Sequence, residues 1–283
     1  MRLTDDQAMS PLIDADAAAA LLEPLTRCVE RAGAAILAVD RTDMRVAGKV
    51  DGSPVTEADL AADRVLAEGL AQLLPEIPAV SEERLDRAKP PHRGSFLLLD
   101  PLDGTREFVA GRSEFTVNLA LVTGGAPLLG IIAAPALGSI WRGVVGRGAE
   151  RLSMSHRPAE TRSVKAAPIH TRPFPPAGQP WTAAVSRSHG DPRTSAFIDA
   201  RPGAIRRTLG SAIKFTGVAE GTIDIYPRLA PTHEWDVAAG HAIVTAAGGR
   251  VTDAFGNDLQ FGMATNDFII PAFIAWGDPS LAR

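Results

Sequence analysis

The sequence predicts a layered protein of helices and sheets, strand-rich (α+β) in its first half and alternating (α/β) in its second. Three patterns support this prediction. Two long stretches with helical spacing open the chain, short apolar runs follow them, and helix and strand patterns then alternate after a proline-rich stretch. With 283 residues, 45% of them hydrophobic, the chain can form one large domain or two smaller ones.

The first half begins with two predicted helices. The first spans about residues 16–39, and we expect Pro24 to break it or to start its second part, because proline suits only a first helical turn. The second spans about residues 57–74, where Thr56 and Asp59 resemble a capping box. Gly124-Gly125 marks a hairpin turn among the strands that follow, which are 96–99, 115–122, 128–133 and 140–145.

A polar, proline-rich stretch at residues 156–180 separates the two halves. We expect it to be mostly irregular and to join an N-terminal α+β half, residues 1–155, to a C-terminal α/β half, residues 156–283. Gly248-Gly249 stops the last predicted helix of the second half. The predicted strands there are 181–186, 222–226 and 250–252, and the predicted helices are 191–199, 211–219 and 235–247.

The composition argues against several classes of function. The chain has 29 Lys and Arg against 33 Asp and Glu, and its longest basic run is Arg206-Arg207, which argues against a groove for polymeric nucleic acid. Cys28 is the single cysteine, so we expect no disulfide and a reducing, cytoplasmic location. Acidic residues interrupt the apolar stretches near the N-terminus, and no run approaches the roughly 18 apolar residues of a membrane span. We therefore expect neither a signal peptide nor an integral membrane segment.

Two carboxylates, Asp100 and Asp103, follow directly on the apolar run that ends at Leu99. The stretch D-P-L-D-G alone is about equally typical of an ordinary turn, because Asp-Pro and Asp-Gly are common turn dipeptides. The alternative is a cation site at a strand end, where Pro101 stiffens the chain and Gly104 permits a sharp bend. Two carboxylates and an intervening backbone carbonyl would then supply the oxygen ligands that Mg²⁺ prefers.

Other acidic positions could join this site, and each has a simpler explanation. Glu82 and Glu83 follow a short apolar run, although a Glu-Glu pair is more often solvated. Asp236 begins a predicted helix, where the helix dipole favours an acid. Asp59 has the capping role already given. Their joint occurrence, rather than any one of them, favours a shared cation site.

The joint pattern resembles the inositol monophosphatase family of Mg²⁺-dependent, lithium-sensitive phosphatases. The stretches S-E-E at 81–83, D-P-L-D-G-T at 100–105 and W-D-V-A-A-G at 235–240 follow the family's order and spacing. S-P-V-T-E-A-D at 53–59 is similar to the family's N-terminal signature. The resemblance covers about residues 20–270 and implies a sandwich of α-β-α-β-α layers, the inositol monophosphatase and fructose-1,6-bisphosphatase-like fold.

Further stretches are similar to one branch, the bacterial 3'(2'),5'-bisphosphate nucleotidases. These stretches are D-G-T-R-E-F, S-E-F-T-V-N-L-A-L, S-R-S-H, G-S-A-I-K-F and D-I-Y-P-R-L-A-P-T. That branch commonly has Lys where this chain has Arg106, which keeps the charge. It has a second Ser where this chain has Ala212, which removes one polar contact near the substrate.

The resemblance implies a site of two or three Mg²⁺ ions beside a substrate-binding wall. The implied metal ligands are Glu82, Asp100, the Leu102 carbonyl, Asp103 and Asp236. Thr105 with Glu82 would orient and deprotonate a water, and Asp59 would help to hold a further ion or its water. The implied substrate-binding residues are Gly104, Thr105, His189, Ser211, Lys214, Arg228 and Asp236.

Simpler explanations exist for the last group too. A lone Lys or Arg is usually a solvated charge, and His189 is equally typical of a surface loop. His233 beside Glu234 could suggest zinc, but two such neighbours without a third ligand are a weak signal. A substrate with two phosphates, however, needs cations beyond the metal cluster, which Lys214 and Arg228 would supply.

The resemblance implies in-line attack of a metal-activated water on the 3'-phosphate of adenosine 3',5'-bisphosphate (PAP). The products would be AMP and phosphate, no phosphoenzyme would form, and PAPS or the 2',5' isomer would be further substrates. Two alternatives remain, an inositol or sugar monophosphate phosphatase and a non-catalytic Mg²⁺- or nucleotide-binding protein. We expect small phosphate esters as partners, and a monomer or homodimer.

Overall fold

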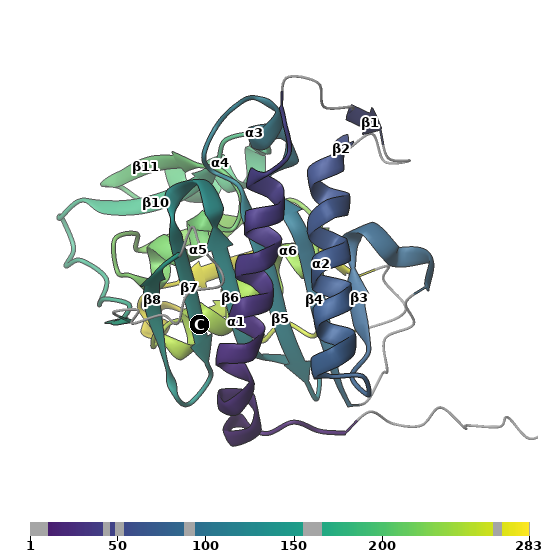
Figure 1. Ribbon diagram of the computed structural model, residues 1–283. Helices are drawn as coiled ribbons and strands as arrows, with labels where there is room; N and C mark the ends of the chain where they lie inside the picture. Colours follow the sequence, from purple (N-terminus) through teal and green to yellow (C-terminus); the bar gives the residue numbers. More distant parts are fainter. Residues whose placement is uncertain are drawn as a thin grey trace, which may run out of the picture.

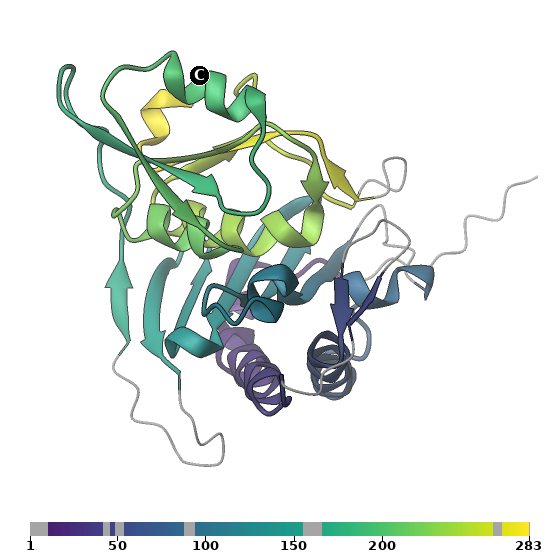
Figure 2. The ribbon, with the colours of Figure 1, turned by 90° about the horizontal axis from the view of Figure 1, so that it is seen from above.

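The computed structural model of the chain describes residues 11–41, 46–48, 54–87, 94–154, 166–262 and 268–282. Its helices and sheets are stacked in α-β-α-β-α layers (Figure 2), which confirms the layered fold predicted from the sequence. Ser53 of the N-terminal signature and residues 156–165 of the proline-rich stretch lie outside the described residues. None of the described helices is long and apolar enough to cross a membrane.

The first layer consists of two long helices, α1 (Ala15–Leu37) and α2 (Glu57–Leu73), which lie side by side across one sheet (Figure 1). The predicted break at Pro24 is wrong, because α1 continues through this residue. Its neighbours Leu25 and Val29 are fully buried, and Thr26 Oγ1 donates to the Leu22 carbonyl at 2.6 Å. Burial of this face outweighs the roughly 3 kcal/mol that a proline costs inside a helix.

The second layer is a seven-stranded sheet whose strands follow one another in sequence order. They are β3 (Ala79–Ser81), β4 (Ser95–Asp103), β5 (Thr116–Thr123), β6 (Ala126–Ala134), β7 (Ser139–Val144), β8 (Gly148–Ser153) and β9 (Ala167–Ile169). All neighbours are antiparallel except β3 and β4, which are parallel. The predicted Gly124-Gly125 turn is confirmed between β5 and β6. The described part of the proline-rich stretch, residues 166–180, is mostly irregular as predicted, and its residues 167–169 form β9 at the edge of this sheet.

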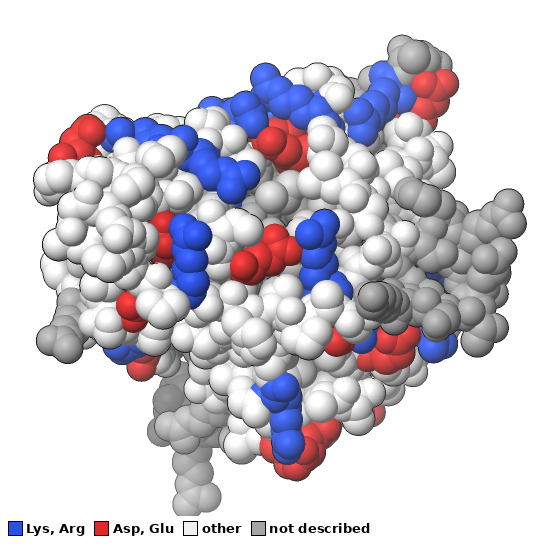
Figure 3. Space-filling view, turned by 90° about the vertical axis from the view of Figure 1, so that its left-hand side faces the viewer, with Lys and Arg blue, Asp and Glu red and all other residues white. Residues whose placement is uncertain are grey.

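The fourth layer is a five-stranded sheet in the order β11-β10-β12-β16-β14. Its strands are β10 (Trp181–Ser186), β11 (Ala204–Leu209), β12 (Ile225–Arg228), β14 (Arg250–Thr252) and β16 (Phe273–Trp276). Residues 205–208 of the edge strand β11 are exposed, and they include Arg206 and Arg207. On the side of the molecule where β10 and β11 lie, basic side chains gather along the upper edge (Figure 3). Charge on an edge strand opposes its pairing with a strand of another chain.

Helices form the remaining layers. Between the sheets lie α5 (Ile213–Ala219) and α6 (Glu234–Ala246), and α4 (Pro192–Asp199) covers the outer face of the second sheet (Figure 2). Shorter elements are α3 (Thr105–Val109), β1 (Val46–Gly48), β2 (Pro54–Thr56), β13 (Thr232–His233), β15 (Ile269–Ile270) and the 3₁₀ turns Glu82–Arg87, Pro135–Leu137 and Pro279–Leu281.

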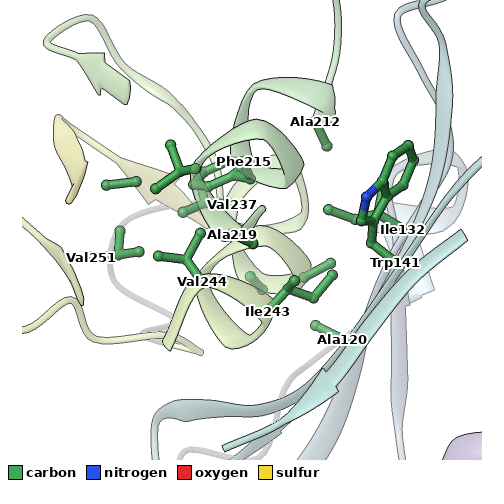
Figure 4. Close-up of a cluster of buried hydrophobic side chains, with 14 of the residues drawn as sticks. Ala120, Ile132, Trp141, Ala212, Phe215, Ala219, Val237, Ile243, Val244 and Val251 are labelled. Atoms are coloured by element: carbon green, nitrogen blue, oxygen red, sulfur yellow. The ribbon is translucent and has the colours of Figure 1, made fainter. Parts of the chain in front are cut away.

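The helix α6 lies between the two sheets with most of its residues buried, and this fixes the position of its N-terminus. Figure 4 shows Val237, Ile243 and Val244 of α6 among side chains of α5 and both sheets. A Cβ at Gly240 would lie 2.2 Å from the Phe215 ring, so only glycine lets α5 approach this closely. The last glycine of W-D-V-A-A-G therefore has a packing role, while Asp236 of the same motif points to the site described next.

Candidate active site

A pocket of about 360 Å³ lies where the end of β4, the ends of β10 and β12, and the starts of α5 and α6 meet. Both halves of the chain contribute to its wall. The pocket brings together nearly all of the sequence-predicted site residues: Glu82, Asp100, Leu102, Asp103, Gly104, Thr105, His189, Ser211, Lys214, Arg228 and Asp236. Asp59 is the exception, since it lies behind Thr105 and does not line the pocket.

The two acids of D-P-L-D-G-T lie on either side of a bulge in β4. Asp100 is paired with Asn118 and Asp103 with Thr116, and the register shifts between the two pairs. The strand therefore extends past its predicted end at Leu99. The bulge changes the direction of the chain so that both acids line the pocket. Asp100 Oδ1 accepts the Leu102 N–H at 3.1 Å, and Asp103 Oδ2 accepts from Asn118 Nδ2 at 3.3 Å.

Gly104 then turns the chain into α3 with a left-handed φ of 90°. A Cβ at this position would lie 3.2 Å from the Glu114 carbonyl and 3.3 Å from Ser211 Cβ. Both the backbone conformation and the space therefore call for glycine. The turn brings Thr105 to the pocket wall directly after the acids.

Thr105 is tied to the N-terminus of α2. Its hydroxyl lies 3.0 Å from Asp59 Oδ1 and 3.2 Å from the Leu102 carbonyl, both of which accept. Asp59 Oδ2 accepts from the backbone N–H and the hydroxyl of Thr56, which confirms the predicted capping box. Asp59 thus both caps α2 and orients the Thr105 hydroxyl. With its proton donated to Asp59, that hydroxyl can accept a hydrogen bond from a molecule in the pocket.

Asp236 reaches the pocket from the first turn of α6. Its Oδ2 accepts the His233 N–H at 3.3 Å and also a hydrogen bond from the Thr232 hydroxyl. The Oδ2 oxygen of Asp236 therefore has the simpler role of an ordinary acid in the first turn of a helix. The same side chain lines the pocket together with the acids of β4, so both interpretations of this residue apply.

The acids repel one another in the buried pocket. Burial, reinforced by the charge of Asp236, raises the pKa of Asp103 to about 6 from an ordinary value of 3.8. Lys214 opposes this effect through its positive charge. A cation between the two carboxylates would relieve the repulsion, because opposite charge favours the ionised form.

The donors in this part of the pocket fit a hard divalent cation. Carboxylates, a threonine hydroxyl and backbone carbonyls supply only oxygen, and no sulfur is available nearby. Among the described residues, no three His, Cys, Asp or Glu side chains are already gathered closely enough to enclose an ion. Several of the acids instead accept hydrogen bonds from protein donors. Ion binding would therefore draw these side chains together and bring in waters as further ligands.

Two cationic side chains, Lys214 and Arg228, also line the pocket. Lys214 is only 3% exposed, burial lowers its pKa to about 8, and its Nζ donates to the Ser211 carbonyl. Its Nζ also lies 5.3 Å from the centre of the Tyr226 ring. The buried Nε of Arg228 has no hydrogen-bond partner among the described residues. Buried cations without a full set of partners favour an anionic ligand here.

Ser211 shows the same lack of partners. Its φ of 45° is left-handed, which is unusual for a residue other than glycine, and its buried hydroxyl has no partner in the described part of the chain. Ser211 is one of the residues that line the pocket. His189 lies at the rim, exposed, with its N–H bonded to Ser186 Oγ at 3.2 Å.

Sequence analysis missed Glu107, a buried acid on α3 that also lines the pocket. Its Oε1 accepts a hydrogen bond from the Ser188 hydroxyl, 81 residues further along the chain. Nearby, Glu114 pairs with Arg187 and accepts the Gly210 N–H at 2.8 Å. These contacts attach the two loops that carry His189 and Ser211 to the first half of the chain. The only signal in the sequence was their place within D-G-T-R-E-F and S-E-F, which says nothing about their partners.

Comparisons with known proteins show which family the chain is similar to. A model of the inositol monophosphatase family matches residues 18–278. The chain is 37% identical to a protein of Salmonella typhimurium named 3'(2'),5'-bisphosphate nucleotidase CysQ, over 89% of this chain and 98% of that protein. The protein of the same name from Buchnera aphidicola is 32% identical, over 90% and 93%. The crystal structure of CysQ from Bacteroides thetaiotaomicron, described as a bacterial member of the inositol monophosphatase family, superposes with a TM-score of 0.73 at 32% identity, over 90% of this chain and 96% of that one. The chain belongs to the inositol monophosphatase family.

Proposed function

We propose that this chain is a Mg²⁺-dependent phosphatase that removes the 3'-phosphate of PAP to give AMP and phosphate. The observation that carries the proposal is that one pocket holds both a set of acids and the two cations Lys214 and Arg228. A cluster of acids suits divalent ions, and buried cations beside it suit a second phosphate on the same substrate. The names of the relatives favour the same substrate class. PAPS and the 2',5' isomer also carry a phosphate monoester on the ribose and an anionic group at the 5' position, and they are proposed as further substrates.

The proposed metal ligands are the carboxylates of Glu82, Asp100, Asp103 and Asp236 with the Leu102 carbonyl. When bound, two or three Mg²⁺ ions would cancel the phosphate charge, lower the pKa of a bound water and stabilise the leaving oxygen. Glu82 would accept the proton of the attacking water, and Thr105, held by Asp59, would orient that water. No side-chain nucleophile is needed, so no phosphoenzyme forms.

The remaining residues would bind and orient the substrate. Gly104 and Thr105 would donate backbone N–H groups to the reacting phosphate, and Ser211, Lys214 and Arg228 would hold the second one. Arg228 can grip a phosphate through two parallel hydrogen bonds. His189 at the rim would contact the base. In this proposal residues 1–155 supply most metal ligands, and residues 156–283 supply the nucleotide-binding groups together with Asp236.

An assay panel tests the substrate. PAP, inositol 1-phosphate and fructose 1,6-bisphosphate are offered at equal concentration with Mg²⁺, and phosphate release is measured. We expect PAP to turn over fastest. Inositol 1-phosphate has no second phosphate for Lys214 and Arg228 to bind, and the two phosphates of fructose 1,6-bisphosphate are spaced differently from those of PAP. Faster hydrolysis of inositol 1-phosphate would favour the monophosphatase alternative. Phosphate trapped covalently on the protein during turnover would contradict direct attack by water.

A further inference from the structure

Asp63 is a buried acid on α2 that lies outside every motif used to predict the site. Its side chain is 8% exposed, and it does not line the pocket. Its Oδ1 accepts from Ser81 Oγ at 2.7 Å and from Arg84 Nε at 3.0 Å. A buried carboxylate is costly unless it is paired and hydrogen-bonded, and these two donors supply both.

The two partners of Asp63 flank Glu82 in the chain. Ser81 is the last residue of β3, and Arg84 lies in the 3₁₀ turn that Glu82 begins. Ser81 Oγ also accepts the Glu83 N–H at 3.4 Å. Arg84 interrupts the turn with a non-helical backbone, φ −138° and ψ 35°. The chain is thus held to Asp63 on both sides of Glu82.

The register of the sheet places this segment beside the acids of β4. In the parallel pair β3–β4, Ser81 is opposite Leu99, so Glu82 follows at the level of Asp100. Both Glu82 and Asp100 line the pocket. A displacement of the end of β3 would therefore move Glu82 relative to the other proposed ligands.

One face of α2 holds both parts of the site. Asp59 and Asp63 are four residues apart and so lie on the same face of the helix. Asp59 binds the Thr105 hydroxyl at 3.0 Å, and Asp63 binds the Ser81 hydroxyl at 2.7 Å. The first turns of α2 therefore set the spacing between the residue that orients the water and the strand end that carries Glu82.

We propose that Asp63, acting through Ser81 and Arg84, is a positioning residue that holds Glu82 ready as a metal ligand. The inference rests on the proposed function for the presence of divalent ions, and it does not depend on which phosphate ester is the substrate. Arg84 Nη2 is already buried without a partner among the described residues, so loss of the Asp63 carboxylate would leave a partly buried guanidinium without its counter-ion and displace the turn. Groups that hydrogen-bond directly to a metal ligand typically contribute about ten- to a hundredfold in metal affinity, and Asp63, which acts through the neighbours of Glu82, should lie at the lower end of this range.

The test measures metal binding to the full chain without substrate. Mn²⁺ is titrated calorimetrically into the wild type and into Asp63→Ala, Ser81→Ala and Arg84→Gln. The matched control is Asp224→Ala, because Asp224 is also buried, pairs with Arg172 at 2.8 Å and does not line the pocket. We expect Mn²⁺ binding to weaken about tenfold or more in Asp63→Ala and by a smaller factor in Ser81→Ala. The control should lose stability and keep the wild-type affinity.

A second readout is the Mg²⁺ concentration that half-saturates phosphate release, which should rise in the same order. A folded Asp63→Ala protein with wild-type Mn²⁺ affinity would overturn the inference. If that variant does not fold, the milder Ser81→Ala and Arg84→Gln variants decide, and unchanged affinity in both would overturn it. A wild type that binds Mn²⁺ but does not hydrolyse PAP would refute the substrate proposal alone. A wild type that binds no Mn²⁺ would refute both.

Discussion

Replacing Asp103 by Asn should make the metal-free protein more stable while abolishing its activity. Asp103 and Asp236 are two like charges in one pocket, and burial with the charge of Asp236 raises the pKa of Asp103 to about 6. The folded-state value lies above the ordinary 3.8, so the ionised carboxylate destabilises the fold above about pH 6, and this penalty fades as the pH falls. The amide keeps the shape and can still accept from Asn118, without the charge.

The pKa of Asp103 sets the size of the expected gain. The change from 3.8 to about 6 corresponds to about 3 kcal/mol against the ionised form in the folded state. We expect Asp103→Asn to recover about 1–3 kcal/mol at about pH 7.5, because the buried amide must find hydrogen bonds of its own. In the wild type, Mg²⁺ at a hundredfold excess over its Kd should raise the free energy of unfolding by about 2.7 kcal/mol. The variant should lose most of this stabilisation.

The assay is urea unfolding in EDTA and in saturating Mg²⁺, with phosphate release from PAP measured in parallel. Asp224→Asn is the control, because Asp224 is a buried acid that is paired with Arg172 and hydrogen-bonded to the Thr182 N–H at 2.7 Å. The same substitution there should cost about 2 kcal/mol. An Asp103→Asn variant that is less stable than the wild type in EDTA would refute the repulsion between Asp103 and Asp236. A variant that retains full stabilisation by Mg²⁺ would refute the metal assignment.

Three further predictions concern Lys214 and the helix α6. Lys214→Met should raise KM for PAP at least about tenfold while leaving Mn²⁺ affinity in calorimetry nearly unchanged, since Lys214 is proposed to bind phosphate and not metal; a matching loss of Mn²⁺ affinity would contradict this. Burial lowers the pKa of His241 to about 4 from 6.5, so the unfolded state takes up a proton first as the pH falls. Because of His241, the free energy of unfolding of the wild type in urea should fall by about 2 kcal/mol between about pH 8 and pH 5. His241→Leu should remove that part of the pH dependence. Parallel curves of unfolding free energy against pH for the two proteins would contradict this prediction. Gly240→Ala places a Cβ against the Phe215 ring, so thermal unfolding should reveal a loss of about 1–3 kcal/mol, and an unchanged Tm would disprove the close packing of α5 on α6.

The sequence predicted best the features that local chain geometry determines. The hairpin at Gly124-Gly125, the cap at Thr56 and the acids around Pro101 each lie within a few residues of the structure they specify. The strand β11 was missed because it is an exposed edge strand with little apolar character. Pro24 was misjudged because burial against the sheet, which no local pattern reveals, determines whether the helix continues.

The supporting residues of the site could not be predicted for the same physical reason. Glu107 contacts Ser188 across 81 residues, and Asp63 contacts Arg84 across 21. Nothing in a single sequence shows that two such residues meet. The motifs identified the groups that line the pocket, whereas the residues that hold those groups became visible only in the folded chain.

The central claim is that acids from separate parts of the chain share divalent ions in one pocket. A crystal of the protein soaked in Mn²⁺, with anomalous scattering recorded at the manganese edge, tests it most directly. We predict two or three anomalous peaks, each within about 2.0–2.4 Å of oxygens from Glu82, Asp100, Asp103, Asp236 or the Leu102 carbonyl. A pocket without such peaks, or peaks held by other residues, would contradict the account.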